Sequence, residues 1–113
     1  MRSTTLSLLP KIELKKHLET MTNWSFENDT IKKEFNFDTY MNSIAFINQL
    51  AERSEKNNHH PDMYVGWCKV NIAFTSNDLG GVTKACITMA KAADEIFLGE
   101  NSSRSLNDCC TNK

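Results

Sequence analysis

Apolar positions recur at the helical period in three stretches of this chain, about residues 10–22, 40–52 and 84–99. In each stretch most of them fall three or four residues apart, which places them on one face of an α-helix. The stripes consist of Ile12, Leu14, Leu18 and Met21, then Tyr40, Ile44, Ile47, Leu50 and Ala51, and finally Cys86, Met89, Ala90, Ala93 and Phe97. The pattern therefore predicts three amphipathic helices, each with one face for a core.

Residues that favour helix ends flank these stretches. Asp38 precedes the second helix and Thr83 the third, and either side chain can accept a hydrogen bond from an N–H of the first turn. Pro10 suits the start of the first helix, which is expected to end near Thr22. Gly99 is expected to end the third helix, because glycine readily adopts the left-handed conformation that terminates helices.

Between the helices, polarity alternates from residue to residue, which is the period of a β-strand. Residues 24–26 and 31–37 are predicted to pair as a hairpin around 27–30, and residues 63–75 to form a second hairpin that reverses near Cys68-Lys69. One face of these strands carries Ile31, Lys33, Phe35, Phe37, Val70, Ile72 and Phe74. The other face is mostly polar, so helices should cover the sheet on one side only.

The order helix, strand, strand, helix, strand, strand, helix favours an α+β fold, with three helices packed on one face of a four-stranded antiparallel sheet. A chain of 113 residues has material for one such domain. We place it at residues 10–99, after a flexible arm of residues 1–9. Residues 100–113 hold few large apolar side chains and are expected to form a disordered tail.

Charge and composition limit the kinds of partner that the protein is expected to bind. The 13 basic and 14 acidic residues are interspersed and give a net charge of -1, so no strong field favours nucleic acid or an anionic membrane. No apolar run approaches the roughly 20 residues that span a bilayer. The four cysteines lack a CxxC spacing. We therefore expect a soluble, cytoplasmic protein that binds neither nucleic acid nor membrane directly.

His59 and His60 stand side by side before Pro61, at the junction between the second helix and the third strand. Because imidazole has an ordinary pKa near ~6.5, one ring of such a pair can accept a proton while the other donates one. Glu55 precedes His59 by four residues and could orient a ring if the helix extends that far. A polar turn without chemistry is the alternative for an arbitrary histidine pair. A zinc site is not favoured, because no further ligands follow at a recognised spacing.

A longer series of residues surrounds the pair in a characteristic order. It comprises Glu55-Lys-Asn-Asn-His59-His60-Pro61-Asp62, then Trp67, Thr75-Ser76 and Gly81-Val82-Thr83, with Phe35-Asn-Phe37-Asp38 upstream. In this order and spacing the chain resembles the pterin-4a-carbinolamine dehydratase family over about residues 10–97.

The resemblance implies the α+β fold given above and a pterin pocket lined by the histidine loop. It also implies a reaction: water is removed from 4a-hydroxytetrahydrobiopterin, the product of aromatic amino acid hydroxylases, to give quinonoid dihydrobiopterin for reuse. No metal or organic cofactor is implied. The residues expected to bind the pterin are Glu55, Asn58, Pro61, Trp67, Thr75 and Ser76.

Loss of hydroxide from a tertiary carbon needs a donor at the departing oxygen and an acceptor for a ring N–H proton, and two imidazoles can fill these roles. The sequence does not decide which ring does which. Our working assignment makes His59 the base and His60 the donor, with Asn77 as the third catalytic position.

The chain departs from the family pattern at two positions. Asn77 stands where the family usually has a third histidine, and an amide can donate a hydrogen bond but cannot exchange a proton near neutral pH. Cys86 stands where the family has an aspartate, and we interpret it as a small buried residue of the helix stripe.

Two functions therefore remain open. The first is a dehydratase, and the second is a binding module, since some members of the family are dimerisation cofactors of a transcription factor. In either case we expect a homodimer or tetramer, because the edges of a four-stranded sheet leave backbone groups that a second copy can pair with.

Overall fold

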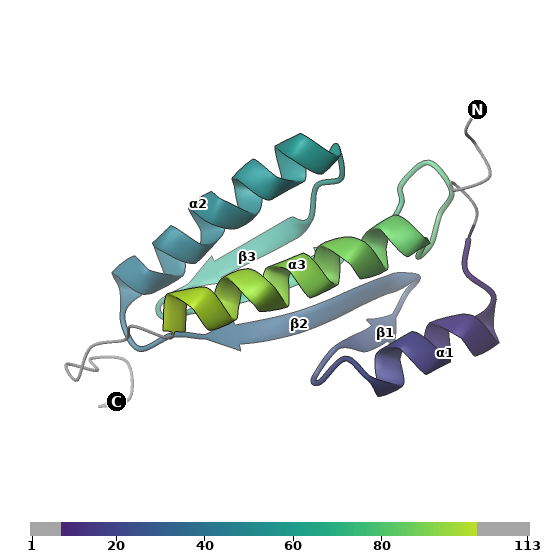
Figure 1. Ribbon diagram of the computed structural model, residues 1–113, viewed down its shortest axis with the longest axis horizontal. Coiled ribbons are helices and arrows are strands. Elements are labelled where there is room, and N and C mark those ends of the chain that lie inside the picture. The colour runs from purple at the N-terminus through teal and green to yellow at the C-terminus, as the bar shows by residue number, and fades with distance from the viewer. Residues whose placement is uncertain (1–7, 102–113) are drawn as a thin grey trace.

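The computed structural model describes residues 8–101 of the chain, which form three helices and one four-stranded sheet (Figure 1). The elements in chain order are α1 (Lys11–Glu19), β1 (Ser25–Glu27), β2 (Thr30–Asn36), α2 (Tyr40–Asn57), β3 (Asp62–Gly66), β4 (Lys69–Phe74) and α3 (Lys84–Asn101). This is the predicted order, and the α+β class is confirmed. Most of the expected arm and tail lies outside the described residues.

The sheet has the strand order β1-β2-β4-β3, with every neighbouring pair antiparallel. Asn28 and Asp29 form the two-residue turn between β1 and β2, and both have positive φ, 53° and 62°. Such φ values give the tight turns whose twist suits a hairpin, and Asn and Asp tolerate them better than most residues. Cys68, with φ 66°, lies in the turn between β3 and β4. Both predicted hairpins are confirmed, with their ends shifted by one residue.

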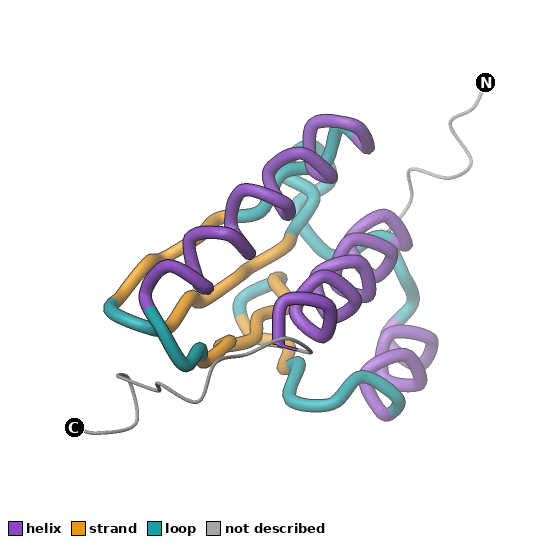
Figure 2. Tube along the Cα trace, turned by 60° about the vertical axis from the view of Figure 1, so that its left-hand side comes forward, coloured by secondary structure: helices purple, strands orange, loops and turns teal. Residues whose placement is uncertain are grey.

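The core lies between one face of the sheet and the helices. Ile31 and Phe35 of β2 and Val70, Ile72 and Phe74 of β4 point into it, and none is more than 1% exposed. In Figure 2 the helices lie to one side of the strands, as the one-sided hydrophobic pattern predicted.

Aromatic rings join the two longer helices to this face. Phe46 of α2 and Phe97 of α3 lie 4.9 Å and 5.1 Å from the ring of Phe35, measured between ring centroids. At the β1 edge of the sheet, Leu14 of α1 belongs to the same core, and an apolar hollow lies between α1 and Phe26 of β1. All three helices therefore contribute to one core.

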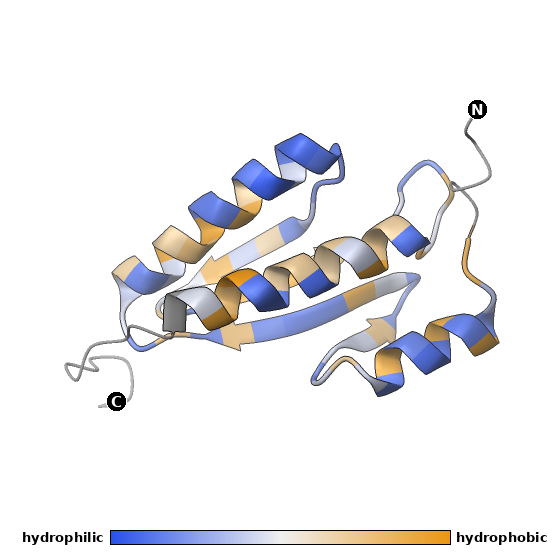
Figure 3. Cartoon of the chain, in the orientation of Figure 1, coloured by the Kyte–Doolittle hydropathy of each residue, from blue (hydrophilic) through white to orange (hydrophobic). Residues whose placement is uncertain are grey.

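Several predicted boundaries are wrong. Thr39 caps α2 in place of Asp38: its side chain accepts the N–H of Asn42 at 3.1 Å. α2 also continues five residues beyond the predicted end at Glu52, to Asn57. This last part of α2 is largely hydrophilic in Figure 3, so the apolar stripe alone did not reveal it.

The ends of the other helices also differ from prediction. α1 ends at Glu19, because the N–H of Thr20 turns back to the carbonyls of His17 and Leu18. α3 continues past Gly99 to Asn101. Gly99 does not have the positive φ that would have ended the helix there.

Candidate active site

The end of α2 determines where the histidine pair lies. Asn58 takes the left-handed conformation, with φ 51° and ψ 44°, and its N–H donates to the carbonyls of Glu55 and Ser54. The next N–H, that of His59, donates to the carbonyl of Ser54 at 3.0 Å. Asparagine is one of the few residues that adopt this conformation readily, so Asn58 terminates the helix. The chain then turns back toward the sheet, and His59 lies over it.

His59 lies between the sheet and α3. Its ring stacks on Phe74, the last residue of β4, with centroids 5.9 Å apart and planes 11° from parallel. Its Nε2 is 3.2 Å from Sγ of Cys86 in the first turn of α3. The side chain also lines a hollow of about 380 Å³ together with Asn57, Ala85, Thr88 and Met89. A space of this size is within the range of small-molecule sites.

Half-burial changes the acid–base behaviour of His59. Loss of hydration lowers its pKa below the ordinary 6.5, and the nearby charge of His60 lowers it further. Both causes disfavour the imidazolium form. His59 is therefore a neutral ring at pH 7, in which one nitrogen donates a hydrogen bond and the other accepts one.

His60 has a different environment. Its Nε2 lies 2.5 Å from Oε2 of Glu55, and both side chains are exposed, at 52% and 78%. Because α2 continues to Asn57, Glu55 lies beside His60. The four-residue spacing had suggested His59 instead. Since both groups face solvent, the contact contributes little to stability and instead orients the imidazole.

The remaining predicted residues lie on two sides of the pair. Pro61 is half-buried between His60 and β3. Beyond Phe74, the Thr75 hydroxyl donates to the carbonyl of Asp29 at 2.7 Å, which ties the end of β4 to the first hairpin turn.

Ser76 organises the loop that leads to α3. Its N–H donates to the carbonyl of Gly81 at 2.7 Å, and its own carbonyl accepts from the N–H groups of Leu79, Gly80 and Gly81. Asn77 is exposed in this loop. Ser76 is therefore held by its backbone, while the Asn77 side chain faces solvent.

Trp67 is not brought to the histidine pair. It is 54% exposed in the turn at the far end of β3. β3 lies between His60 and Trp67, and its five residues, rising about 3.3 Å each, span roughly 16 Å. Within one chain, the two cannot contact the same small ligand.

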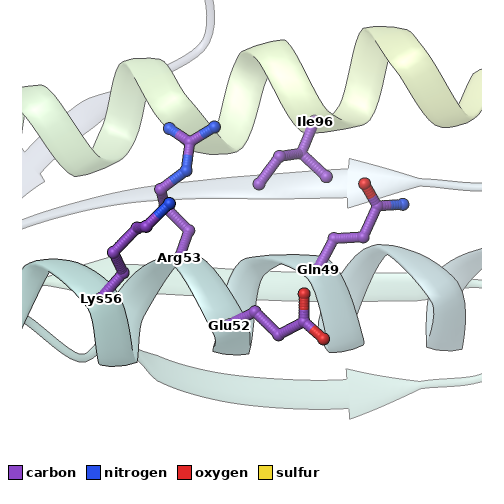
Figure 4. A pocket seen from close by; sticks show the side chains of 5 residues that line it. All are labelled: Gln49, Glu52, Arg53, Lys56 and Ile96. Carbon is purple, nitrogen blue, oxygen red and sulfur yellow. The ribbon is translucent and has the colours of Figure 1, made fainter.

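A second hollow, of about 320 Å³, lies between α2 and α3 (Figure 4). Arg53 and Lys56 point together toward α3, whereas Glu52 points away from it. The lining contains no imidazole or thiol and none of the predicted site residues. The candidate site therefore remains at His59, where a group that titrates near neutrality borders a hollow.

Known proteins of similar sequence show which family the chain belongs to. Residues 7–96 match the family model described as Pterin 4 alpha carbinolamine dehydratase. The chain belongs to this family. A relative from Prochlorococcus marinus (strain NATL2A) is 38% identical over 92 residues, covering 81% of this chain and 97% of the relative. One from Aquifex aeolicus (strain VF5) is 36% identical over 88 residues, covering 78% and 89%. Both carry provisional names as pterin-4-alpha-carbinolamine dehydratases.

Two solved structures of similar fold have titles that extend beyond catalysis. A transcriptional coactivator/pterin dehydratase from Brucella melitensis superposes with a TM-score of 0.77 at 25% identity, covering 80% of this chain and 98% of that one. A pterin dehydratase-like protein, described as a RuBisCO assembly factor in the alpha-carboxysome, gives 0.55 at 28% identity, covering 66% and 86%. Family membership therefore fixes the fold, and the activity must be argued from the site.

Sequence reasoning missed most of the surroundings of His59. Phe74 was predicted as core, which it is, but its stacking with the imidazole was not foreseen. Cys86 is buried, as expected for a stripe residue, and it also contacts the imidazole. The spacing of Ala85, Thr88 and Met89 along α3 could have indicated a shared face, but not that α2 ends opposite it.

Residues 8–101 give little support for other kinds of site. Within this range no three His, Cys, Asp or Glu side chains lie where they could hold a metal ion. No helix in the same range is long and apolar enough to cross a membrane. Catalysis without metal or organic cofactor remains a prediction.

Proposed function

We propose that the protein removes water from 4a-hydroxytetrahydrobiopterin to give quinonoid dihydrobiopterin, and so returns pterin used by aromatic amino acid hydroxylases. The observation that carries the proposal is the unlike environment of two neighbouring imidazoles. His59 is half-buried, with a pKa below 6.5, and borders a hollow. His60 is exposed beside the carboxylate of Glu55. Unlike environments allow one ring to act as acceptor and the other as donor at the same pH.

The chemistry needs two proton movements. The bond between C4a and the hydroxyl oxygen breaks with its electron pair leaving on oxygen, while the N5 proton passes to a base. The departing oxygen needs a hydrogen-bond donor and finally a proton, which completes the water. Each well-placed proton transfer contributes roughly 10²- to 10⁴-fold to the rate. His59 and His60 supply these functions, with Glu55 orienting His60.

The remaining site residues are proposed to position the pterin. Thr75 and Ser76 directly follow Phe74, on which His59 stacks, so their backbone begins beside the histidine ring. Asn58 and Pro61 shape the loop that carries the pair. Asn77 is proposed to donate a hydrogen bond through its amide. Trp67 is left out of the site within one chain because of its distance.

A direct assay tests the proposal. A hydroxylase generates the 4a-hydroxypterin, and ultraviolet absorbance follows its dehydration with wild-type protein, His59→Ala and His60→Ala. His17→Ala is the matched control, because this third imidazole lies on α1 away from the pair. We expect each site variant to lose about 10²-fold or more, and the control to keep the wild-type rate. Equal rates for all four proteins would refute the proposal that this protein is a dehydratase.

A second candidate is a module that binds a protein partner, such as the dimerisation cofactor of a transcription factor. The observation that favours it is Asn77, an exposed amide where the family usually has an imidazole. The two structural relatives, described as a transcriptional coactivator and as a RuBisCO assembly factor, support it. A wild-type rate equal to the uncatalysed rate, raised by Asn77→His, would favour the binding module over the dehydratase.

We also propose a homodimer or tetramer, which the two open sheet edges support. β1 and β3 each pair with one neighbour only among the described strands. Light scattering during size-exclusion chromatography measures the mass directly, and a mass of 12.9 kDa at every concentration would refute self-association. The cytoplasmic location remains a prediction.

A further inference from the structure

Cys86 makes a contact that the family pattern does not explain. It is fully buried in the first turn of α3, with 0% exposure. Its Sγ lies 3.2 Å from Nε2 of His59 and 3.7 Å from Oγ1 of Thr83. Thr83 is itself only 2% exposed. A thiol between a hydroxyl and an imidazole can direct hydrogens from one to the other.

The hydrogens can be arranged in two ways. In the first, the Thr83 hydroxyl donates to the sulfur, and the thiol donates to Nε2 of His59. In the second, Nε2–H of His59 donates to the sulfur, and the thiol donates to the Thr83 oxygen. Among residues 8–101 the Thr83 hydroxyl has no other hydrogen-bond partner. The second arrangement therefore leaves a buried hydroxyl hydrogen without an acceptor.

The first arrangement is favoured, because the hydrogens of Thr83 and Cys86, both buried, each find an acceptor, and the one hydrogen left without a protein partner is on the half-buried ring of His59. A buried donor without an acceptor loses its hydration with nothing to compensate for it. Imidazole nitrogen is also a better acceptor than thiol sulfur, which accepts only weakly. A neutral His59 whose Nε2 accepts from the thiol must carry its own hydrogen on Nδ1. The structure gives Nδ1 no partner among the described residues, so that hydrogen remains available to a ligand.

We propose that Cys86 is a positioning residue that fixes neutral His59 as the tautomer with its hydrogen on Nδ1, which makes His59 a hydrogen-bond donor to the ligand. A carboxylate at this position would act in the opposite sense, because it only accepts and would hold the hydrogen on Nε2. The replacement of the family's aspartate by cysteine therefore reverses which nitrogen of the His59 ring donates a hydrogen bond and which accepts one.

The consequence for catalysis rests on the proposed function. His59 Nδ1–H then stabilises the departing oxygen, and His60 becomes the base, which reverses our working assignment. The carboxylate of Glu55 can only accept a hydrogen from Nε2 of His60, so Nδ1 of His60 is the nitrogen left to take the proton from N5 of the pterin. The hydroxide leaves C4a with the bonding pair and takes this proton to form water. Both rings end as they began. A neutral imidazole can act as a hydrogen-bond donor in this way.

Nitrogen NMR tests the tautomer without reference to activity. Long-range proton–nitrogen correlation spectra of ¹⁵N-labelled protein at pH 7.5 show which ring nitrogen carries the hydrogen. We expect protonated Nδ1 and unprotonated Nε2 for His59 in the wild type. We expect the same tautomer in Cys86→Ser, whose hydroxyl also donates, and the reverse in Cys86→Asp. Protonated Nε2 in the wild type overturns the proposal, even if the aspartate variant fails to fold.

Kinetics separate this proposal from the proposed function. If the wild type is active, we expect Cys86→Ala to lower kcat about 10- to 100-fold with little change in KM, and Cys86→Ser to recover part of the loss. Equal losses in kcat for alanine and serine would point to packing alone and overturn the positioning role. An inactive wild type with hydrogen on Nδ1 refutes the dehydratase but supports the tautomer. An active wild type with hydrogen on Nε2 refutes the tautomer alone.

Discussion

The ion pair between Lys33 and Asp94 offers the sharpest test of how the sheet is held to α3. Lys33 lies on the core face of β2, and its Nζ is 2.8 Å from Oδ1 of Asp94 on α3. The other carboxylate oxygen accepts the indole N–H of Trp24 at 3.0 Å. The lysine and aspartate side chains are only 13% and 28% exposed. Asp94→Ala would therefore leave two donors without an acceptor.

The expected cost follows from these two orphaned groups. Removing one partner of a fully buried ion pair costs roughly 3–5 kcal/mol. Because Lys33 keeps some access to solvent, we expect the lower end of this range, about 3 kcal/mol in total, for Asp94→Ala. A domain of this size loses roughly 4–8 °C in Tm per kcal/mol, so the shift should be about 12–24 °C. Lys33→Met should cost only about 1 kcal/mol, because Asp94 remains partly hydrated and still accepts from Trp24.

Denaturation in urea, followed by circular dichroism, measures each free energy of unfolding. In the double variant Lys33→Met/Asp94→Ala, we expect a cost about 2 kcal/mol smaller than the sum of the two single costs. Lys32→Met is the matched control: this neighbour lies on the open face and pairs with Glu27 at 3.3 Å, with side chains 43% and 66% exposed. It should cost less than about 1 kcal/mol. Strict additivity, or equal costs for Asp94→Ala and Lys32→Met, would refute the reasoning.

Three further predictions concern the site and the first hairpin. His60→Gln should raise the pKa of His59 without restoring it to 6.5, because burial, the larger cause, remains; an unchanged NMR titration of the His59 ring would contradict this. Folding lowers the pKa of His59, so below about pH 6.5 the unfolded chain binds more protons than the folded protein. The contribution of His59 to the free energy of unfolding is therefore complete above that pH and is lost as the pH falls. Urea midpoints at pH 7.5 and 5.5 should differ less in His59→Gln, and an identical difference would remove this residue as the cause. Asp29→Val should destabilise by about 1–2 kcal/mol, because a branched side chain opposes φ 62°, whereas Asp29→Gly should be tolerated in the same urea assay.

The fold could be predicted to this extent because its determinants are local and periodic. The alternation in residues 31–37 placed Lys33 on the apolar face of β2, where the structure has it. Its partner Asp94 could not be predicted, because the pair is separated by 61 positions and depends on how α3 crosses the sheet. The helix ends failed for a related reason. Gly99 permits but does not require a left-handed residue, and α2 continues through a polar segment that lacks an apolar stripe.

The histidine pair was found from sequence because its residues are neighbours, whereas the group that sets the chemistry of His59 is not. Cys86 lies 27 positions from His59 and meets it only because Asn58 ends α2 opposite the first turn of α3. From the sequence, Cys86 was predicted to be a small residue of an apolar stripe, and its burial agrees with that prediction. Its hydrogen-bonding role follows only from the second contact, to Thr83. A substitution that removes a family carboxylate therefore does not simply remove a function. A thiol donates where a carboxylate accepts, so the same position can keep the imidazole in place while exchanging which of its nitrogens carries the hydrogen.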